Sequence, residues 1–329
     1  MEWQQELSEK GYQKVAERLA NIHSCDYFLK ELTLIIKGCV PAASNLPDDI
    51  HILYNQLTSL TTFCEEYKPI IMRDLKFLFI EITNPSNKCA QMYSSTTEEG
   101  IALYHQAMQG NVAAQLKLAY FYQAIERDDW AFDWFKVVAD LGSAEAQYWL
   151  GNAYFVGKVI KRNLEKAFFY YKEAAEHEHG DALNNYADMY LRGEFVEQDE
   201  GRALELFKLA AGKGVPEAMY TLGHMYENAV GTEVDMVESK RWFTESALCG
   251  DVFAANRLGH EAVEDGRGDE AIAWYQLAAD QGDAYGEFNL GVCYESGIGT
   301  HVNIKKAKYW YKKAAVKGDE QAKQKLEEF

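Results

Sequence analysis

The sequence predicts an all-α protein, in which a solenoid of helix–loop–helix units follows a smaller N-terminal helical region. Two observations carry this prediction. The phrase "AKYWYKKAAVKGD" (307–319) also occurs with changes as "AIAWYQLAADQGD" (271–283) and "AFFYYKEAAEHEH" (167–179). Inside each phrase, apolar residues recur three and four positions apart, which is the spacing of one helix face. A phrase restated along the chain at a helical period indicates architecture rather than a catalytic motif.

The N-terminal region, residues 1–95, is predicted to hold about four helices and a linker. Prolines punctuate four amphipathic stretches in it. These stretches lie at roughly 3–22, 26–39, 47–65 and 69–82. The linker is the turn-rich "TNPSNKCAQMYSS" (83–95). Two arrangements stay open for the helices, a separate bundle and a divergent set of helical pairs.

The repeat region, residues 96–329, is expected to open with a degenerate half repeat. The stretch "TTEEGIALYHQAMQG" (96–110) has the pattern of the second helix of a unit. Thr96 and Glu99 are spaced three apart, as in a capping box that closes the start of a helix. Six full units are then expected from about residue 110.

Each full unit begins with a first helix that is anchored on a small residue. A mostly leucine position follows the anchor at +4, a small residue at +5 and, in most units, a tyrosine at +8. These spacings lie on one helical face, where the small residues let a second helix approach closely. The anchors are 32 or 36 residues apart, and the last belongs to a capping helix: Ala114, Ala146, Ala182, Ala218, Ala254, Gly286 and Ala322.

A second helix follows in each unit, with bulky residues at +3 and +4 from its own anchor and mostly alanine at +7 and +8. Its anchors are Ala131, Ala167, Ala203, Ser239, Ala271 and Ala307. In five units a glycine stands 11 residues after the anchor and predicts the end of the helix. Glu178 stands where the sixth glycine is expected.

The connecting loop absorbs the variation in repeat length. From the +8 position of the first helix to the second anchor is 13 residues in four units and 9 in the other two. A surface loop tolerates such a loss, whereas a packed helix would have its apolar face displaced. At the far end, "DEQAKQKLEEF" (319–329) is predicted to be a polar helix that caps the solenoid.

The unit resembles a known repeat. The pattern A-x-x-x-L-G-x-x-Y, a loop ending in "GIGTHVNIKKA" and then A-x-x-W-Y-x-x-A-A-x-x-G is similar to the Sel1-like repeat, a relative of the tetratricopeptide repeat. The resemblance spans about residues 96–329. It implies a right-handed, curved superhelix that binds other proteins. Members of the family act as adaptors, signalling scaffolds and immunity proteins against bacterial toxins.

The composition limits the classes of binding partner and the cellular compartment that are expected. The formal net charge is −18, and no basic stripe that could displace counterions from nucleic acid or an anionic membrane is visible. The six cysteines lie far apart without a C-x-x-C pair, which favours a reducing compartment. The start "MEWQQELSEKGYQKV" lacks the basic and apolar segments of a secretory signal. We therefore expect a cytoplasmic protein that binds neither nucleic acid nor membranes.

Motifs of catalysis and cofactor binding are not evident in the sequence. The "GIGT" of residues 297–300 has no lysine-bearing phosphate loop around it and predicts a turn. His177 and His179, with Asp181 nearby, form an H-x-H motif. Two residues two apart point to different faces of a helix, which disfavours shared metal coordination. We expect no cofactor, no metal and no enzymatic activity, with hidden chemistry in residues 1–95 as the remote alternative.

The first helices are expected to line the concave side, by analogy with tetratricopeptide pairs. Positions −1, +2, +6 and +9 from each anchor would point inward without being buried. Aromatic residues there would anchor a protein partner, and carboxylates would steer a basic one. For the +2 tyrosines, packing between repeats is an equally open interpretation. The predicted partner-binding residues are Glu145, Tyr148, Asn152, Asn184, Asp188, Glu217, Tyr220, His224, Glu227, Asn256, His260, Phe288 and Glu295.

These features predict a non-enzymatic protein-binding module. The specific hypothesis is a cytoplasmic immunity protein that neutralises a bacterial toxin with a basic surface. An adaptor or scaffold that assembles a cellular or signalling complex is the alternative. The oligomeric state, and whether residues 1–95 also contact the partner, stay open.

Overall fold

The computed structural model describes residues 103, 106, 107, 110–124 and 126–329. The helices predicted within residues 1–82 and the linker 83–95 lie outside the described residues. Of the predicted half repeat, Leu103, Gln106 and Ala107 are described and helical, and Ala107 is fully buried.

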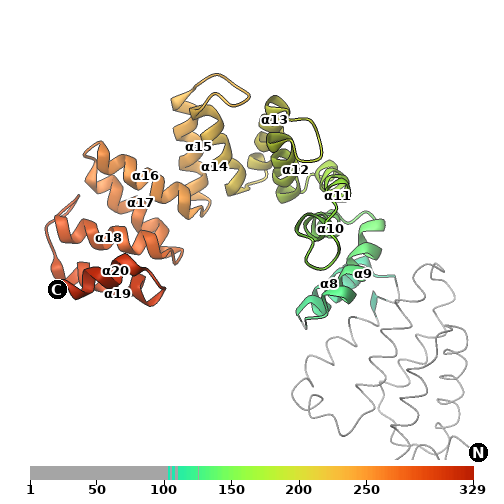
Figure 1. Cartoon of the computed structure of the whole chain (residues 1–329), viewed down its shortest axis with the longest axis horizontal. Coiled ribbons are helices and arrows are strands. Elements are labelled where there is room, and N and C mark those ends of the chain that lie inside the picture. The colour runs from blue at the N-terminus through green and yellow to red at the C-terminus, as the bar shows by residue number, and fades with distance from the viewer. Residues whose placement is uncertain (1–102, 104–105, 108–109, 125) are drawn as a thin grey trace, which may run out of the picture. The chain divides into compact units, whose positions relative to one another are not determined.

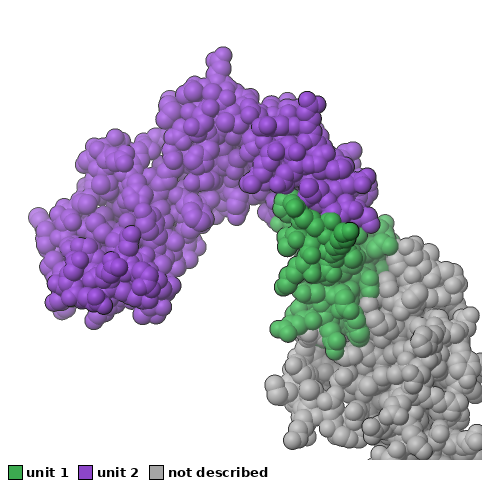
Figure 2. Space-filling model, in the orientation of Figure 1, with its two compact units in different colours: residues 1–162 green, residues 163–329 purple. Residues whose placement is uncertain are grey.

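The chain divides into two compact units, Met1–Arg162 and Asn163–Phe329 (Figure 2). All thirteen regular elements among the described residues are α-helices (Figure 1). The described part of the first unit holds α8 (Val112–Ala124), α9 (Asp128–Asp140) and α10 (Ala144–Val156). The second unit holds α11 (Leu164–Glu176), α12 (Gly180–Arg192), α13 (Glu200–Gly212), α14 (Pro216–Glu227), α15 (Met236–Leu248), α16 (Val252–Glu264), α17 (Gly268–Asp280), α18 (Ala284–Ser296), α19 (Ile304–Val316) and α20 (Glu320–Glu327).

These helices alternate as the sequence predicts, and the all-α solenoid is confirmed. The even-numbered helices α8 to α18 are the first helices of the six units, and the odd-numbered helices α9 to α19 are the second helices. Within the second unit, α14 packs on α15, α16 on α17, and α18 on α19, and each pair also contacts the next. In the second compact unit the core therefore lies along the contacts between successive first and second helices.

The +4 position of the second helix carries a large buried aromatic side chain in every unit. Its residues are at most 3% exposed: Phe135, Tyr171, Phe207, Phe243, Tyr275 and Tyr311. A glycine of the first helix lies directly under the ring in the fourth unit. A Cβ atom on Gly223 would stand only 2.7 Å from the ring of Phe243. The small residue predicted at +5 is there because the neighbouring aromatic ring leaves no space.

Side-chain caps define where the helices begin. Asp251 and Asp283 accept backbone N–H groups at the starts of α16 and α18, and Asn303 does so at α19. At the far end, Ala322 and Leu326 of α20 pack against the last core cluster, around Ala307 and Tyr311. None of the described helices is long and apolar enough to cross a membrane.

Candidate protein-binding face

The predicted binding residues lie on first helices, and twelve of the thirteen are at least partly exposed. Glu145, Tyr148 and Asn152 lie on α10 of the first compact unit. The other ten lie on α12, α14, α16 and α18 of the second unit, where one row of helices presents them. The two sets are described separately here because they belong to different compact units.

Asn256 is the exception, because it is buried and not open as predicted. Only 6% of its surface is exposed. Its Nδ2 donates to the carbonyl of Val252 at 2.9 Å and to Oδ2 of Asp283 at 2.8 Å. Asp283 in turn accepts the backbone N–H of Gly286 at the start of α18. Asn256 thus ties α16 to the cap of the next first helix, and the expectation that it faces a partner directly is wrong.

Most of the predicted acidic residues already have partners within the chain. Asp188 pairs with Arg192 one turn along α12, with 2.8 Å between Oδ2 and Nε. Glu227 of α14 pairs with Arg257 of α16. In each pair an arginine of the chain neutralises a carboxylate that could otherwise attract a cationic partner.

Glu145 and Glu295 also interact with side chains of the chain, whereas the carboxylate of Glu217 forms no ion pair among the described residues. Glu145 accepts a hydrogen bond from the hydroxyl of Tyr120. Glu295 accepts one from Tyr311, and Lys325 of α20 lies 3.1 Å from its carboxylate. The Tyr311 hydroxyl first, and Lys325 after it, keep the pKa of Glu295 below its ordinary value. Glu217 is exposed, and within the described residues no ion pair involves its carboxylate.

His224 is packed between aromatic rings rather than free in solvent. Its ring centroid lies 4.7 Å from that of Tyr220 and 5.1 Å from that of Phe243. Burial, followed by the positive charge of Arg257, lowers the pKa of this imidazole. The ring is therefore mainly neutral at pH 7. Its Nδ1 lies 3.5 Å from Oε2 of Glu227.

His260 occupies the same slot one unit further on and joins two tyrosines. Its Nε2 lies 3.0 Å from the hydroxyl of Tyr285, and its Nδ1 lies 3.0 Å from the hydroxyl of Tyr275. Tyr275 is a core residue of α17, whereas Tyr285 is 45% exposed on α18. His260 therefore positions an exposed aromatic side chain against the core.

Two of the predicted aromatic anchors are partly used for packing. Tyr220 meets Phe243 edge to face, with 5.4 Å between centroids, and borders the core cluster of that unit. Phe288 lies 5.6 Å from Tyr311 and borders the last cluster. Each therefore has a stabilising role as well as an exposed edge.

The most exposed aromatic residues of this row were not among the predicted ones. Phe253 of α16 is 71% exposed, and Tyr285 of α18 is 45% exposed. Both stand at the −1 position, which also gave Glu145 and Glu217, so the signal was present in the sequence. We define the first-helix aromatic face as the side chains presented by α14, α16 and α18: Tyr220, His224, Phe253, His260, Tyr285 and Phe288.

The loop between α18 and α19, which contains the "GIGT" stretch, packs against the start of α17. Gly299 has a φ of +65°, and its Cα lies against the backbone of Gly268 at the start of α17, where a Cβ would clash. Arg267, the cation beside this loop, already pairs with Asp265 at 2.7 Å and also with Glu270. The predicted turn is present, and its glycine is required by contact with the preceding unit.

His177 and His179 serve as helix ends. His177 ends α11, and its Nδ1 lies 3.0 Å from the carbonyl of Glu173. His179 precedes α12, and its Nδ1 accepts the backbone N–H of Ala182. Within the part of the chain that the structure describes, no group of three or more His, Cys, Asp or Glu residues is placed to hold a metal ion.

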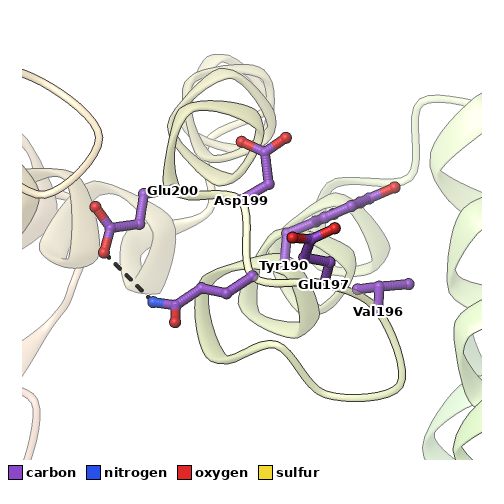
Figure 3. A pocket seen from close by; sticks show the side chains of 6 residues that line it. Tyr190, Val196, Glu197, Asp199 and Glu200 are labelled. Carbon is purple, nitrogen blue, oxygen red and sulfur yellow. Dashed lines mark hydrogen bonds between the residues drawn. The ribbon is translucent and has the colours of Figure 1, made fainter.

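A shallow hollow of about 650 Å³ lies where α12 passes into α13 (Figure 3). Tyr190, Val196 and the carboxylates of Glu197, Asp199 and Glu200 line it. Asp199 caps α13, and Glu200 accepts both the side chain of Gln198 and the backbone N–H of Gly231. Two of the three carboxylates are thus engaged in holding the loop, so the hollow is a consequence of loop packing.

Comparison with known proteins identifies the family. The Sel1 repeat model matches six consecutive segments, 112–143, 144–179, 180–215, 216–251, 252–283 and 284–319. These segments follow the observed helix pairs. The chain belongs to the Sel1 repeat family, and it is a Sel1-repeat protein-binding module.

Two curated proteins illustrate the similarity. DAP3-binding cell death enhancer 1 of Mus musculus is 29% identical over 198 residues, which are 60% of this chain and 32% of that protein. Chitin synthase regulator SKT5 of Saccharomyces cerevisiae is 31% identical over 58% of this chain and 30% of its own length. The chain thus spans about a third of the length of these curated relatives.

Solved structures agree with the fold. A Sel1 repeat protein from Oxalobacter formigenes superposes with a TM-score of 0.63 at 26% identity, over 90% of this chain and 89% of that one. The protein c5321, a protective antigen of uropathogenic Escherichia coli, gives a TM-score of 0.60 at 29% identity, over 69% of this chain and 50% of that one.

Proposed function

We propose that this chain is a non-enzymatic adaptor that holds a protein partner against the first-helix aromatic face. The observation that carries the proposal is the exposure of Phe253 and Tyr285 at the same slot of consecutive units. Large rings on a rigid helix row offer contact area with little loss of side-chain entropy, which is typical of binding hot spots. His260 adds a polar group that orients Tyr285.

The relatives support an adaptor role. One is named for binding DAP3, and another is named as a regulator of chitin synthase. Both names describe action through another protein. The narrower proposal, an immunity protein that blocks a toxin, is motivated by the acidic chain and its lack of a recognisable catalytic motif. The engagement of Asp188 and Glu227 within the chain weakens the electrostatic part of that argument.

Site-specific photo-crosslinking in cells tests the proposal. A benzophenone side chain at Phe253 or Tyr285 is expected to trap one or a few defined proteins. The control is Phe169 on the second helix α11, which is 52% exposed and lies off the proposed face. Trapping of the same proteins from Phe169, or trapping from Phe169 alone, would contradict the proposed face.

The identity of the trapped protein separates the two functions. Several cellular proteins of moderate affinity indicate an adaptor. A single protein that arrests growth when expressed alone, and that the chain renders harmless, indicates immunity. In that case the variant Phe253→Ala should restore toxicity while its helical melt stays as in the wild type, because the side chain is mainly exposed.

A further inference from the structure

Helix α19 is a basic element in an acidic protein. It carries five lysines and no carboxylate across Ile304–Val316, and Lys317 follows directly. The whole chain has a net charge of −18. Without the +5 of α19 the remainder carries −18 − 5, or −23. Positive charge is thus concentrated on one helix of the last unit.

The first turn of α19 places lysine where the other second helices of its unit place acid. Acidic residues occupy the first turn of α11, α13, α15 and α17. In α19 that turn holds Lys305 and Lys306 instead. Cations are unfavourable at a helix N-terminus, because the exposed N–H groups carry partial positive charge. Lys305 and Lys306 therefore weaken the isolated helix. A residue choice that costs local stability indicates a role in binding rather than in folding.

The lysines differ in whether the chain itself neutralises them. Lys313 and Lys317 lie 3.3 and 2.8 Å from the buried carboxylate of Glu287. In contrast, no carboxylate among the described residues lies within ion-pair distance of Lys305, Lys306 or Lys312.

Exposed apolar side chains alternate with the unpaired lysines. Tyr309 is 56% exposed, and Val316 is 88% exposed. Lys305, Tyr309, Lys312 and Val316 follow one another at intervals of four, three and four residues, so they form one stripe along the helix. We define the α19 stripe as these four residues together with Lys306. The opposite side of the helix, with Ala307, Tyr311 and Ala314, is the packed side.

We propose that the α19 stripe is a second protein-binding surface, and that its occupant is an acidic segment of another protein that carries apolar side chains. Charge complementarity selects the acidic partner, and Tyr309 and Val316 supply the apolar contacts. The remainder of the chain, at −23, repels anionic membranes and nucleic acid. A two-fold contact with a second copy would set lysine against lysine.

This surface is chemically unlike the first-helix aromatic face, and it lies on a second helix. The proposal stands whether or not that face binds a partner. If both surfaces are used, the chain joins two proteins, one through aromatic anchors and one through lysines.

Fluorescence anisotropy with the full chain tests the inference. The probe is a labelled peptide in which glutamate pairs alternate with leucine, and the comparison peptide contains glutamate alone. The triple variant Lys305→Glu, Lys306→Glu, Lys312→Glu should weaken binding of the leucine-containing probe about tenfold or more, since three favourable pairs become repulsive. Tyr309→Ala with Val316→Ala should weaken this probe about threefold, and leave the weaker glutamate-only peptide unchanged.

The matched control is Lys117→Glu, Lys158→Glu, Lys161→Glu, which changes the net charge by the same amount at exposed positions of the first compact unit, whereas α19 belongs to the second. It should bind the probe like the wild type. Equal loss in both triple variants, or no binding by the wild type, would overturn the proposal. Stripe-dependent binding that is tighter to phosphatidylserine vesicles or duplex DNA than to the peptide would also overturn it. Self-association that the stripe variant abolishes would assign the surface to a second copy instead.

Discussion

At the scale of single residues, Glu178 shows how the repeat tolerates a departure from its pattern. The second residue after the end of each second helix adopts a left-handed backbone, and in five units it is a glycine: Gly142, Gly214, Gly250, Gly282 and Gly318. Glu178 adopts the same conformation, with a φ of 60°. This conformation is strained for a residue with a Cβ atom. Lys213 lies 2.6 Å from the Glu178 carboxylate, but both side chains are exposed and the pair adds little.

The variant Glu178→Gly should therefore raise the melting temperature. Relief of the strained backbone exceeds the loss of an exposed ion pair, and a gain of about 2–4 °C is expected for a unit of this size. Glu178→Gln is the control, because it removes the charge and keeps the strained backbone. It should leave the melting temperature nearly unchanged. If Gln and Gly shift the melt equally, the side chain rather than the backbone sets the effect.

The hydroxyl of Tyr311 gives a prediction for acid stability. It donates to Glu295 and helps to hold the pKa of that carboxyl below its ordinary value of 4.5. A carboxyl whose pKa is lower in the folded state stabilises the fold above its unfolded pKa. That stability is lost as the pH falls through the folded pKa. The last unit should thus lose stability below about pH 5.

Tyr311→Phe should reduce this pH dependence while keeping the buried ring. Urea unfolding at pH 6 and pH 4, followed by circular dichroism, measures it. Tyr275→Phe is the matched control, because its hydroxyl bonds His260 and not a carboxylate. The variant of Tyr311 should lose more stability at pH 6 than at pH 4. The same pattern in the Tyr275 variant would show that Glu295 is not responsible.

At the scale of helices, the close contact between first and second helices requires small residues, because an aromatic ring of the second helix occupies the space that a larger side chain would need. Gly223 of α14 lies under the ring of Phe243 of α15, where a Cβ atom would approach to 2.7 Å. Gly223→Ala should destabilise the chain by about 1–3 kcal/mol through overpacking. Gly212→Ala is the control, because nothing lies within 4 Å of its added Cβ, and it should be neutral or slightly stabilising. Equal urea midpoints for the two variants would show that the ring of Phe243 moves aside.

The repeat pattern predicted the helices well because packing in a solenoid is local. The position of Phe243 over Gly223 follows from spacing within one unit. Contacts between units were harder to predict, because they join residues at different positions of the repeat. Asn256 is buried by Asp283 of the next unit. Glu227 reaches Arg257 across the same kind of boundary.

Short loops show a related limit. The stretch "ERDD" (126–129) marks a short connection in the sequence, yet Asp128 and Asp129 already belong to the first turn of α9. Their carboxylates favour the helix N-terminus. The loop proper is therefore shorter than the spacing of polar residues indicates. By contrast, the −1 spacing alone could have pointed to Phe253 and Tyr285, both of which are exposed in the structure.

At the scale of the whole molecule, the net charge differs from the charge that is left unpaired and can act on a partner. The chain carries −18, but Asp188 and Glu227 lie in ion pairs, whereas Glu217 on α14 is exposed. Long-range attraction of a basic partner depends on the sum of all charges, while local steering depends on those not neutralised nearby. Mutating a paired carboxylate therefore changes stability as well as binding.

This distinction predicts separate kinetic effects for two side chains, once the partner of the aromatic face is in hand. Glu217→Lys should slow association and flatten its dependence on salt. It should also lower the melting temperature slightly, because Glu217 lies in the first turn of α14, where a cation is unfavourable. Phe253→Ala should leave association unchanged and speed dissociation, with a loss of about 2 kcal/mol or more if the ring fills a pocket on the partner. Surface plasmon resonance at two salt concentrations measures both rates. If both variants bind normally while deletion of residues 1–95 abolishes binding, recognition belongs to the N-terminal region and the repeats support it.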